Sequence, residues 1–328
     1  MAVRLGRRDL LGLIAAAVAA PSALARPARY PAPERELMVS VPGGRVYVRV
    51  NGPLGGPRAP VVMIHGGPGG THAGFLDALE LANERAVILY DQLDSGRSDH
   101  PLDPANWRVE RFVDELEAIR AALGVPRWHV AGASWGGTVA LEYGARRPTA
   151  LAGLALLSPL VSTRSWIADA NALRGKLPGE VQATLTRCEA STPPPKAQCD
   201  AATEQFYAQF LRREPLPEAF KAYRDPRDRG FNERLYLTMW GPTEFAATGT
   251  LKAYDGEPLL ARLDGRRTLF MVGQYDEARP VTAVAFSERV PGAELAVVPG
   301  AGHAVLVDRP DEATALLRAW LARQDRLG

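Results

Sequence analysis

The sequence VAGASWGG at residues 130–137 decides the fold class of this chain. Apolar residues lead into a Gly-x-Ser-x-Gly pattern centred on Ser134, and a segment of helical character follows it. This order predicts a strand that turns sharply into a helix around the serine, the arrangement called a nucleophile elbow. Gly132 and Gly136 flank the turn because side chains at these positions would collide in so tight a bend. The turn would expose the Ser134 hydroxyl and aim the backbone N–H of Trp135, at the helix N-terminus, at a developing oxyanion.

Apolar runs on both sides of the elbow alternate with segments of helical periodicity. Strands are expected at 37–41, 45–50, 60–64, 86–90, 127–131, 151–157, 268–272 and 295–298. Helices are expected between and after them, at 109–123, 135–147, 282–290 and 311–326. This alternation predicts an α/β fold with a mostly parallel, doubly wound sheet. A chain of 328 residues can hold one such domain together with an insertion.

The alternation stops between about residue 159 and residue 255, where no strand-like run occurs. Amphipathic stretches separated by proline take its place, at 164–176, 178–188, 201–213 and 231–240. We therefore predict a helical cap, or lid, over 159–255, inserted into a core formed by 37–158 and 256–328.

The N-terminus reads as an export signal. GRRDLL at residues 6–11 resembles the twin-arginine motif, an apolar run follows over 10–20, and ALA at 23–25 has the small-x-small pattern of a cleavage site. The run is too short to span a bilayer comfortably. We expect residues 1–25 to be a leader, the protein to be periplasmic or secreted, and no stable membrane association after cleavage.

The chain has two cysteines, Cys188 and Cys199, on either side of a triple proline at 193–195. In an oxidising compartment a disulfide across this short loop is favoured, and two free buried thiols are the alternative.

The charge balance points away from polyanionic partners. The formal net charge is +2, and the arginines of the predicted leader account for this excess, so the rest of the chain is formally neutral. We therefore expect no nucleic-acid partner, and the oligomeric state is left open.

An activated serine needs a base, and the base needs an acid that orients it. On this type of sheet the three follow in the order serine, acid, histidine. Asp276 comes first after the strand at 268–272, with Glu277 as its rival, and His303 follows the last strand as the only histidine after His129. We predict Ser134 as nucleophile, His303 as base and Asp276 as the orienting acid.

The loop HGGPG at 65–69 follows a buried strand and is the second predicted source of oxyanion donors. Its glycines allow the backbone to approach a substrate carbonyl, so the N–H of Gly67 would act together with that of Trp135. His65 is interpreted as a residue that organises this loop rather than as a base. This chemistry needs no metal and no organic cofactor.

Several motifs carry a resemblance to a known family, and they occur in the same order. They are HGGPG at 65–69, DQxxSGRS at 91–98, GxSWGG at 132–137, WGPxEF at 240–245 and GxYDE at 273–277. From about residue 37 onward the chain resembles the proline iminopeptidase group of α/β-hydrolases, which are serine peptidases that remove an N-terminal residue. Two positions depart from the family pattern: Asp94 replaces the usual glycine, and Ala133 replaces a common glycine.

The resemblance implies further roles. In this family two glutamates hold the free α-ammonium group of the substrate, and by motif they correspond to Glu244 and Glu277 here. A pair of carboxylates that binds the ammonium group would fix the position of the substrate terminus, so that cleavage occurs after the first residue. Aromatic residues near the lid motif are candidates for an apolar pocket around the first side chain: Trp240, Phe245, Phe206, Tyr207 and Tyr236.

The sequence thus predicts an exported α/β-hydrolase with a helical lid that acts as a serine aminopeptidase on peptides or aminoacyl amides, with proline preferred by family resemblance. Alternatives on the same scaffold are an esterase or lactonase, or an amino-acid amidase. A lid-bearing binding protein without catalysis is a more remote alternative.

Overall fold

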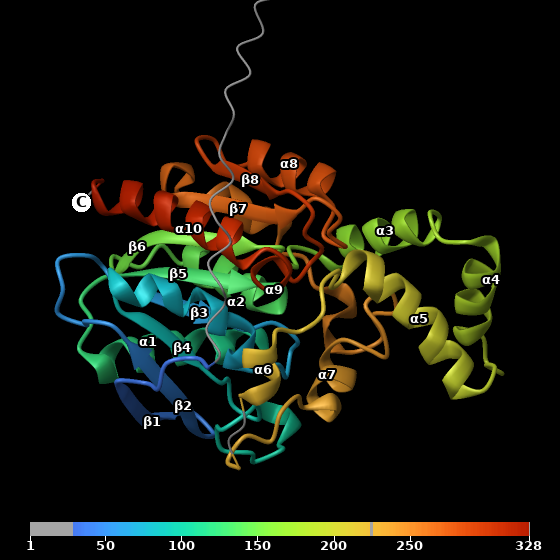
Figure 1. Cartoon of the computed structure of the whole chain (residues 1–328), viewed down its shortest axis with the longest axis horizontal. Helices are drawn as coiled ribbons and strands as arrows, with labels where there is room; N and C mark the ends of the chain where they lie inside the picture. Colours follow the sequence, from blue (N-terminus) through green and yellow to red (C-terminus); the bar gives the residue numbers. More distant parts are fainter. Residues whose placement is uncertain (1–28, 224–225, 328) are drawn as a thin grey trace, which may run out of the picture.

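The computed structural model describes residues 29–223 and 226–327. These residues form one sheet of eight strands in the order β1-β2-β4-β3-β5-β6-β7-β8 (Figure 1). The strands are β1 (Arg35–Val41), β2 (Gly44–Asn51), β3 (Val61–Ile64), β4 (Val87–Tyr90), β5 (Trp128–Ala133), β6 (Leu151–Leu157), β7 (Thr268–Gly273) and β8 (Glu294–Val298). β2 runs antiparallel to β1 and to β4, and the neighbours from β4 to β8 are parallel. The predicted α/β fold with a mostly parallel sheet is therefore confirmed.

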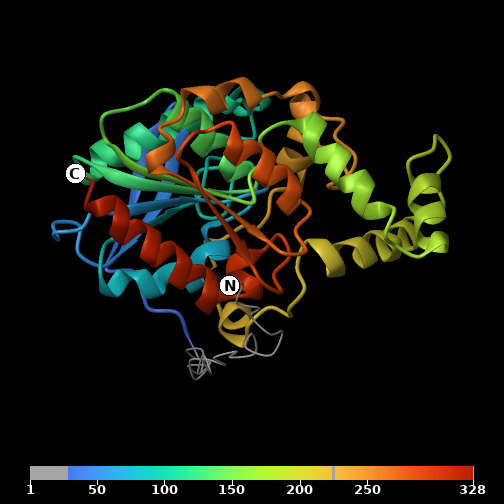
Figure 2. The ribbon, with the colours of Figure 1, turned by 90° about the horizontal axis from the view of Figure 1, so that it is seen from above.

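Helices cover both faces of this sheet. The helices that follow or connect its strands are η1 (His72–Asn83), α1 (Val109–Leu123), α2 (Trp135–Ala145), α8 (Pro280–Glu288), α9 (Val305–Asp308) and α10 (Pro310–Asp325). One apolar core joins the sheet to α1, α2 and α8, and a second joins its other face to η1, α9 and α10. Figure 2 shows α10 and η1 together on one side of the sheet. Because both faces are covered, β3, β4 and β7 are buried at every residue.

The region between β6 and β7 is helical in its described residues, apart from isolated bridges. Its α-helices are α3 (Thr163–Arg174), α4 (Gly179–Cys188), α5 (Lys196–Phe210), α6 (Glu218–Ala222) and α7 (Glu233–Met239). In Figure 1, α3, α4 and α5 project beyond the sheet on the right. They enclose a small apolar core of their own, and a disulfide between Cys188 and Cys199 joins the end of α4 to α5.

None of the helices in the described part of the chain is both long enough and apolar enough to cross a bilayer. The leader predicted for residues 1–25 lies outside the described residues.

Candidate active site

Ser134 stands between the end of β5 and the start of α2, with φ 57° and ψ −122°. This backbone conformation is unfavourable for a residue with a side chain, and its surroundings hold it in place. A Cβ atom on Gly132 would come within 2.0 Å of the carbonyl oxygen of Gly136. A Cβ atom on Gly136 would come within 2.0 Å of the carbonyl oxygen of Ile64. Both positions therefore require glycine, and the packing that excludes a side chain there also fixes the serine.

The glycine loop after β3 lies against this serine. A Cβ atom on Gly66 would be 3.1 Å from the Cβ of Ser134, and Gly67 has a φ of 114°, which favours glycine. Trp135 is the first residue of α2, so its backbone N–H has no partner within the helix. The structure thus brings the loop, the serine and the start of α2 together at one edge of the sheet.

Gln92 links the glycine loop to α2. Its backbone N–H donates to His65 Nε2 at 3.0 Å, and its side-chain amide donates to the His65 carbonyl at 2.9 Å. Its side-chain oxygen accepts from the indole N–H of Trp135 at 2.9 Å. His65 Nδ1 in turn donates to the carbonyl of Gly66 at 2.9 Å, and burial lowers the pKa of His65. A neutral His65, with both ring nitrogens in hydrogen bonds, therefore organises the loop as predicted for this residue. The role of Gln92 was not predicted, although the sequence shows that Gln92 lies just after a buried strand.

Asp94 explains one of the departures from the family pattern. Its φ of 64° lies in the left-handed region, where glycine is favoured and aspartate is tolerated better than most residues. The carboxylate accepts from the indole N–H of Trp107 at 2.8 Å and from the backbone N–H of Leu102 at 2.8 Å. The side chain therefore adds two hydrogen bonds at a position whose backbone otherwise suits glycine.

Asp276 follows β7 and lies against His303, which follows β8. The carboxylate accepts from His303 Nδ1 at 2.9 Å and from the backbone N–H of Ala278 at 2.8 Å through one oxygen. Its other oxygen accepts from the hydroxyl of Ser158 at 2.5 Å and from the backbone N–H of Gly273 at 3.0 Å. Both oxygens of this buried acid thus accept hydrogen bonds, and one of them holds the imidazole at its Nδ1 edge. Ser158 was not predicted as a site residue, since its only signal in the sequence is its position directly after β6.

His303 and Ala133, the residue before Ser134, line one cavity. Among the described residues no hydrogen bond joins Ser134 to His303, a bond that is often long in ligand-free enzymes and tightens with substrate.

Glu277 lies on the opposite side of the imidazole from Asp276. Its Oε1 is 3.8 Å from His303 Nε2, and neither of its buried oxygens accepts a hydrogen bond from the described residues. Burial and the nearby charge of Glu244 raise the pKa of Glu277 well above its usual range. The structure therefore distinguishes the two acids that the sequence offers for the orienting role. Asp276 forms a hydrogen bond with Nδ1 of His303, and Glu277 faces Nε2.

Glu244 belongs to the loop after α7 and is half-buried. Its Oε1 accepts from the hydroxyl of Tyr236 at 2.7 Å, and its backbone N–H donates to the hydroxyl of Tyr207 at 3.4 Å. Burial raises the pKa of Glu244, and this effect outweighs the hydrogen bond from Tyr236 and the charge of His303. The inserted helices and the segment after β7 thus bring two carboxyl groups close together beside the histidine.

Aromatic rings surround these carboxyl groups. Trp166 of α3 packs edge-on to His303, with ring centroids 5.4 Å apart, and donates its indole N–H to the carbonyl of Glu244 at 3.0 Å. Trp166 also packs edge-on to Trp240, with ring centroids 6.1 Å apart. Phe206 and Phe245 instead pack on each other in the core of the inserted helices. Trp166 was not predicted as a site residue, because it lies far from every motif in the sequence.

The charge around His303 determines its protonation. Burial alone would lower the pKa of His303, but the carboxylates of Asp276, Glu277 and Glu244 outweigh burial and raise the pKa to about 9. In the absence of substrate the histidine is therefore protonated at neutral pH.

Comparison with known proteins identifies the family. Residues 59–310 match the model of the α/β-hydrolase fold. The proline iminopeptidase of Heyndrickxia coagulans is 36% identical over 87% of this chain and 98% of its own length. The chain belongs to the proline iminopeptidase group of α/β-hydrolases.

Solved structures of similar proteins agree with this membership of the proline iminopeptidase group. The crystal structure of proline iminopeptidase from Mycobacterium smegmatis has a TM-score of 0.79 at 32% identity and covers 89% of this chain and 99% of its own. The crystal structure of VinJ has a TM-score of 0.80 at 32% identity and covers 89% of this chain and 100% of its own. The family and the enzyme class predicted from the sequence, a serine aminopeptidase on the α/β-hydrolase scaffold, are confirmed.

Proposed function

We propose that this enzyme releases an N-terminal residue, with proline preferred, from peptides or aminoacyl amides through an acyl-enzyme. The observation that carries the proposal is the environment of Glu277, a buried carboxyl group whose oxygens accept no hydrogen bond from the described residues. Burial of an unpartnered carboxylate is unfavourable, so a site that retains one beside a second carboxyl group is suited to a cationic ligand. The α-ammonium group of a peptide terminus, which is a secondary ammonium in the case of proline, supplies such a cation.

In the proposed mechanism the Ser134 hydroxyl attacks the carbonyl carbon that follows the first residue, and His303 Nε2 accepts its proton. Asp276 holds Nδ1 and stabilises the imidazolium that forms. The backbone N–H groups of Gly67 and Trp135 bind the oxyanion. The C–N bond breaks as His303 returns the proton to the leaving amine, and a water molecule then hydrolyses the acyl-enzyme with the same histidine as base.

The glutamates would also activate this base. Their charge contributes to the raised pKa of His303, and a bound substrate ammonium group would offset that charge. The pKa of His303 would then fall, so that the histidine becomes neutral when a free-amine substrate occupies the site. This coupling would follow from a role in amine recognition for Glu244 and Glu277, because only a bound cation would offset their charge.

The preference for proline is supported by the curated relatives, which are named proline iminopeptidases. The ring of Trp166 packs on His303 and the ring of Trp240 packs on Trp166, so aromatic side chains lie close to the proposed position of the pyrrolidine ring. A panel of chromogenic aminoacyl amides that includes proline and alanine tests this preference.

The decisive experiment compares substrates with and without the charged amine. Glu244→Gln and Glu277→Gln keep the shape of the site and remove its charge. A charge-assisted hydrogen bond is worth about 1.5–3 kcal/mol, so each variant should lose roughly ten- to a hundredfold in kcat/KM on prolyl 4-nitroanilide. Hydrolysis of 4-nitrophenyl acetate, which has no amine, should not fall, and at neutral pH it should rise as the pKa of His303 falls.

The matched control is Glu180→Gln, which alters an exposed glutamate of α4. Because both substrates are measured on each variant, a general loss of folded enzyme cancels in the ratio. Equal losses on the two substrates would assign the glutamates to structure and favour the esterase or lactonase alternative. Activity on aminoacyl amides without activity on dipeptides would favour the amidase alternative.

We also propose that the protein is exported by the twin-arginine route and acts in the periplasm or outside the cell. The motif at residues 6–11 supports this, as does the disulfide between Cys188 and Cys199, because such bonds persist in oxidising compartments. Replacing Arg7 and Arg8 by lysine should leave unprocessed precursor inside the cell, whereas the control Arg4→Lys should be processed normally. Normal processing of the double variant would exclude this route.

A further inference from the structure

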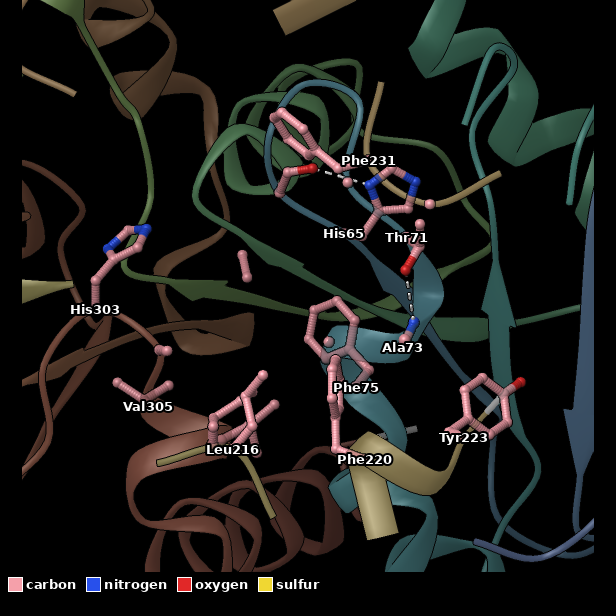
Figure 3. Close-up of a pocket in the computed structure, with 18 of the residues that line it drawn as sticks. His65, Thr71, Ala73, Phe75, Leu216, Phe220, Tyr223, Phe231, His303 and Val305 are labelled. Atoms are coloured by element: carbon pink, nitrogen blue, oxygen red, sulfur yellow. Dashed lines mark hydrogen bonds between the residues drawn. The ribbon is translucent and has the colours of Figure 1, made fainter. Parts of the chain in front are cut away.

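A cavity of about 660 Å³ opens beside His303. Figure 3 shows His303 on one side of it, His65 and Phe231 on the other, and Phe75, Phe220 and Val305 along its floor. The lining also includes Gly66 of the glycine loop, but neither Glu244 nor Glu277. The cavity therefore reaches His303 and the glycine loop from a direction other than that of the carboxyl pair.

The walls of this cavity are apolar. Its volume lies within the range of about 300–1,000 Å³ that is usual for small-molecule sites, and its contributors include Phe75, Leu216, Phe220, Phe231 and Val305. These side chains come from three separate parts of the chain: Phe75 from η1, Val305 from α9, and Leu216, Phe220 and Phe231 from α6 and the loops on either side of it. Such a surface favours a large apolar group over a charged one.

The polar groups along the walls are engaged within the protein. The hydroxyl of Tyr223 bonds to His72 at 2.7 Å and accepts from Arg97 at 2.7 Å, so the ring forms the wall. At the rim, Lys221 donates to Glu218 at 2.6 Å and Asp228 accepts from the backbone N–H of Gly230 at 2.7 Å.

The position of this cavity assigns it to one part of the substrate. In the proposed function the two parts of a substrate diverge at the carbonyl carbon held over Ser134. One part carries the ammonium group toward Glu277, and the other part is the amine that leaves after protonation by His303. We infer that the cavity is the leaving-group site and that the enzyme selects substrates in which the leaving amine carries a bulky apolar group.

This inference rests on the proposed function and adds a substrate class to it: amides of N-terminal proline with a large aromatic or aliphatic amine. The same chemistry is presented by a peptide with a large apolar second residue and by a simple amide of an apolar amine. The experiment must therefore separate these two sources.

Four prolyl amides make this separation. The methylamide and the phenethylamide differ in the apolar group while their leaving amines have comparable basicity, and the glycinamide and the phenylalaninamide repeat this difference in a peptide. The phenyl group should raise kcat/KM roughly ten- to a hundredfold if it is buried. A gain in both pairs assigns the cavity to the second residue of a peptide, and a gain confined to the simple amides assigns it to a non-peptide amine.

Two variants locate the effect in the cavity. Phe220→Ala and, independently, Leu216→Ala should each lower the ratio of phenethylamide to methylamide kcat/KM, roughly fivefold for the loss of part of the apolar contact. The control Leu237→Ala removes an exposed apolar side chain of α7 outside the cavity and should leave both rates unchanged. Because the readout is a ratio, partial misfolding of either variant does not imitate the result.

The outcomes distinguish this inference from the function on which it rests. Hydrolysis of all four amides at similar kcat/KM would overturn the leaving-group site and leave the aminopeptidase proposal standing. A phenyl gain that neither cavity variant reduces would also overturn it. If none of the four amides were hydrolysed, both proposals would fail together.

Discussion

Asp276 and Glu277 are adjacent in the chain and carry the same functional group, yet their surroundings are opposite. Asp276 accepts four hydrogen bonds, from His303, Ser158, Gly273 and Ala278. Glu277 accepts none from the described residues, although it is equally buried. The comparison teaches that burial alone does not reveal the role of a carboxyl group. An acid whose partners are all supplied by the protein is held in place, and an acid without partners has its binding capacity available for a ligand.

The largest effect expected from this comparison follows from Asp276→Asn. The amide keeps the shape of the acid but removes the charge that stabilises the imidazolium, so kcat should fall about 10⁴-fold. Steady-state kinetics on prolyl 4-nitroanilide would measure this loss, with Ser134→Ala as the reference for complete loss of the nucleophile. A loss no larger than that of Glu277→Gln would contradict the assignment of the two acids.

A smaller effect is expected from Ser158→Ala. The hydroxyl of Ser158 holds one oxygen of Asp276, while three other donors remain, so kcat should fall roughly tenfold through a less well-oriented histidine. Ser158→Gly, which suits the φ of 46° at this position, should lose the rate to a similar extent because it also lacks the hydroxyl. Full activity in both variants would show that the hydroxyl does not position Asp276.

The pH profile distinguishes the two acids by the direction of its shift. A neutral His303 is required as base, so kcat/KM should rise with pH up to about 9, the pKa of the free enzyme. Glu277→Gln removes a charge that favours the imidazolium, so the rise should move to lower pH. An unchanged or higher midpoint in this variant would contradict the described electrostatics.

The smallest expected effect concerns stability and has opposite signs for the two acids. The pKa of Glu277 is raised in the folded state, so this group makes the protein less stable as pH rises from the usual carboxyl range toward its folded pKa. Glu277→Gln should therefore stabilise the fold by about 1 kcal/mol at pH 9.5, where His303 is losing its charge, and by less at pH 6. Asp276→Asn should destabilise it by about 1–3 kcal/mol. Thermal unfolding at the two pH values would measure both, and destabilisation by Glu277→Gln at pH 9.5 would show that Glu277 has a structural partner.

Regular elements with clear periodicity were predictable from the sequence. Helix α1 and strand β6 have the predicted boundaries, because a left-handed glycine at 124 ends the helix and a continuous apolar run defines the strand. The start of α5 was predicted five residues too late, since the triple proline that precedes Lys196 leads directly into the helix. Helix η1 was missed, although Phe75, Ala78, Leu79 and Ala82 have helical spacing in its sequence.

The proposed catalytic serine, acid and histidine could be nominated from the sequence because each follows a strand, and the ends of parallel strands meet at one edge. Their supporting residues could not be nominated in this way. Ser158 and Gln92 act through side-chain hydrogen bonds between neighbouring strand ends, and these depend on strand order and register. The pairing of Glu244 with Glu277 came from family resemblance alone, since no local pattern connects the inserted helices to the segment after β7.

The hydrogen bond between Asp94 and Trp107 restricts which substitutions can be accepted at these two positions during evolution. Mutation of Asp94 to the glycine that is usual in the family would suit the backbone, but it would leave the buried indole N–H of Trp107 without its hydrogen-bond acceptor. Replacement of Trp107 first would remove that penalty, so that the change to glycine would then lose only the hydrogen bond from the backbone N–H of Leu102. The two positions are therefore epistatic, and across descendants of this sequence we expect aspartate at 94 to be inherited together with tryptophan at 107.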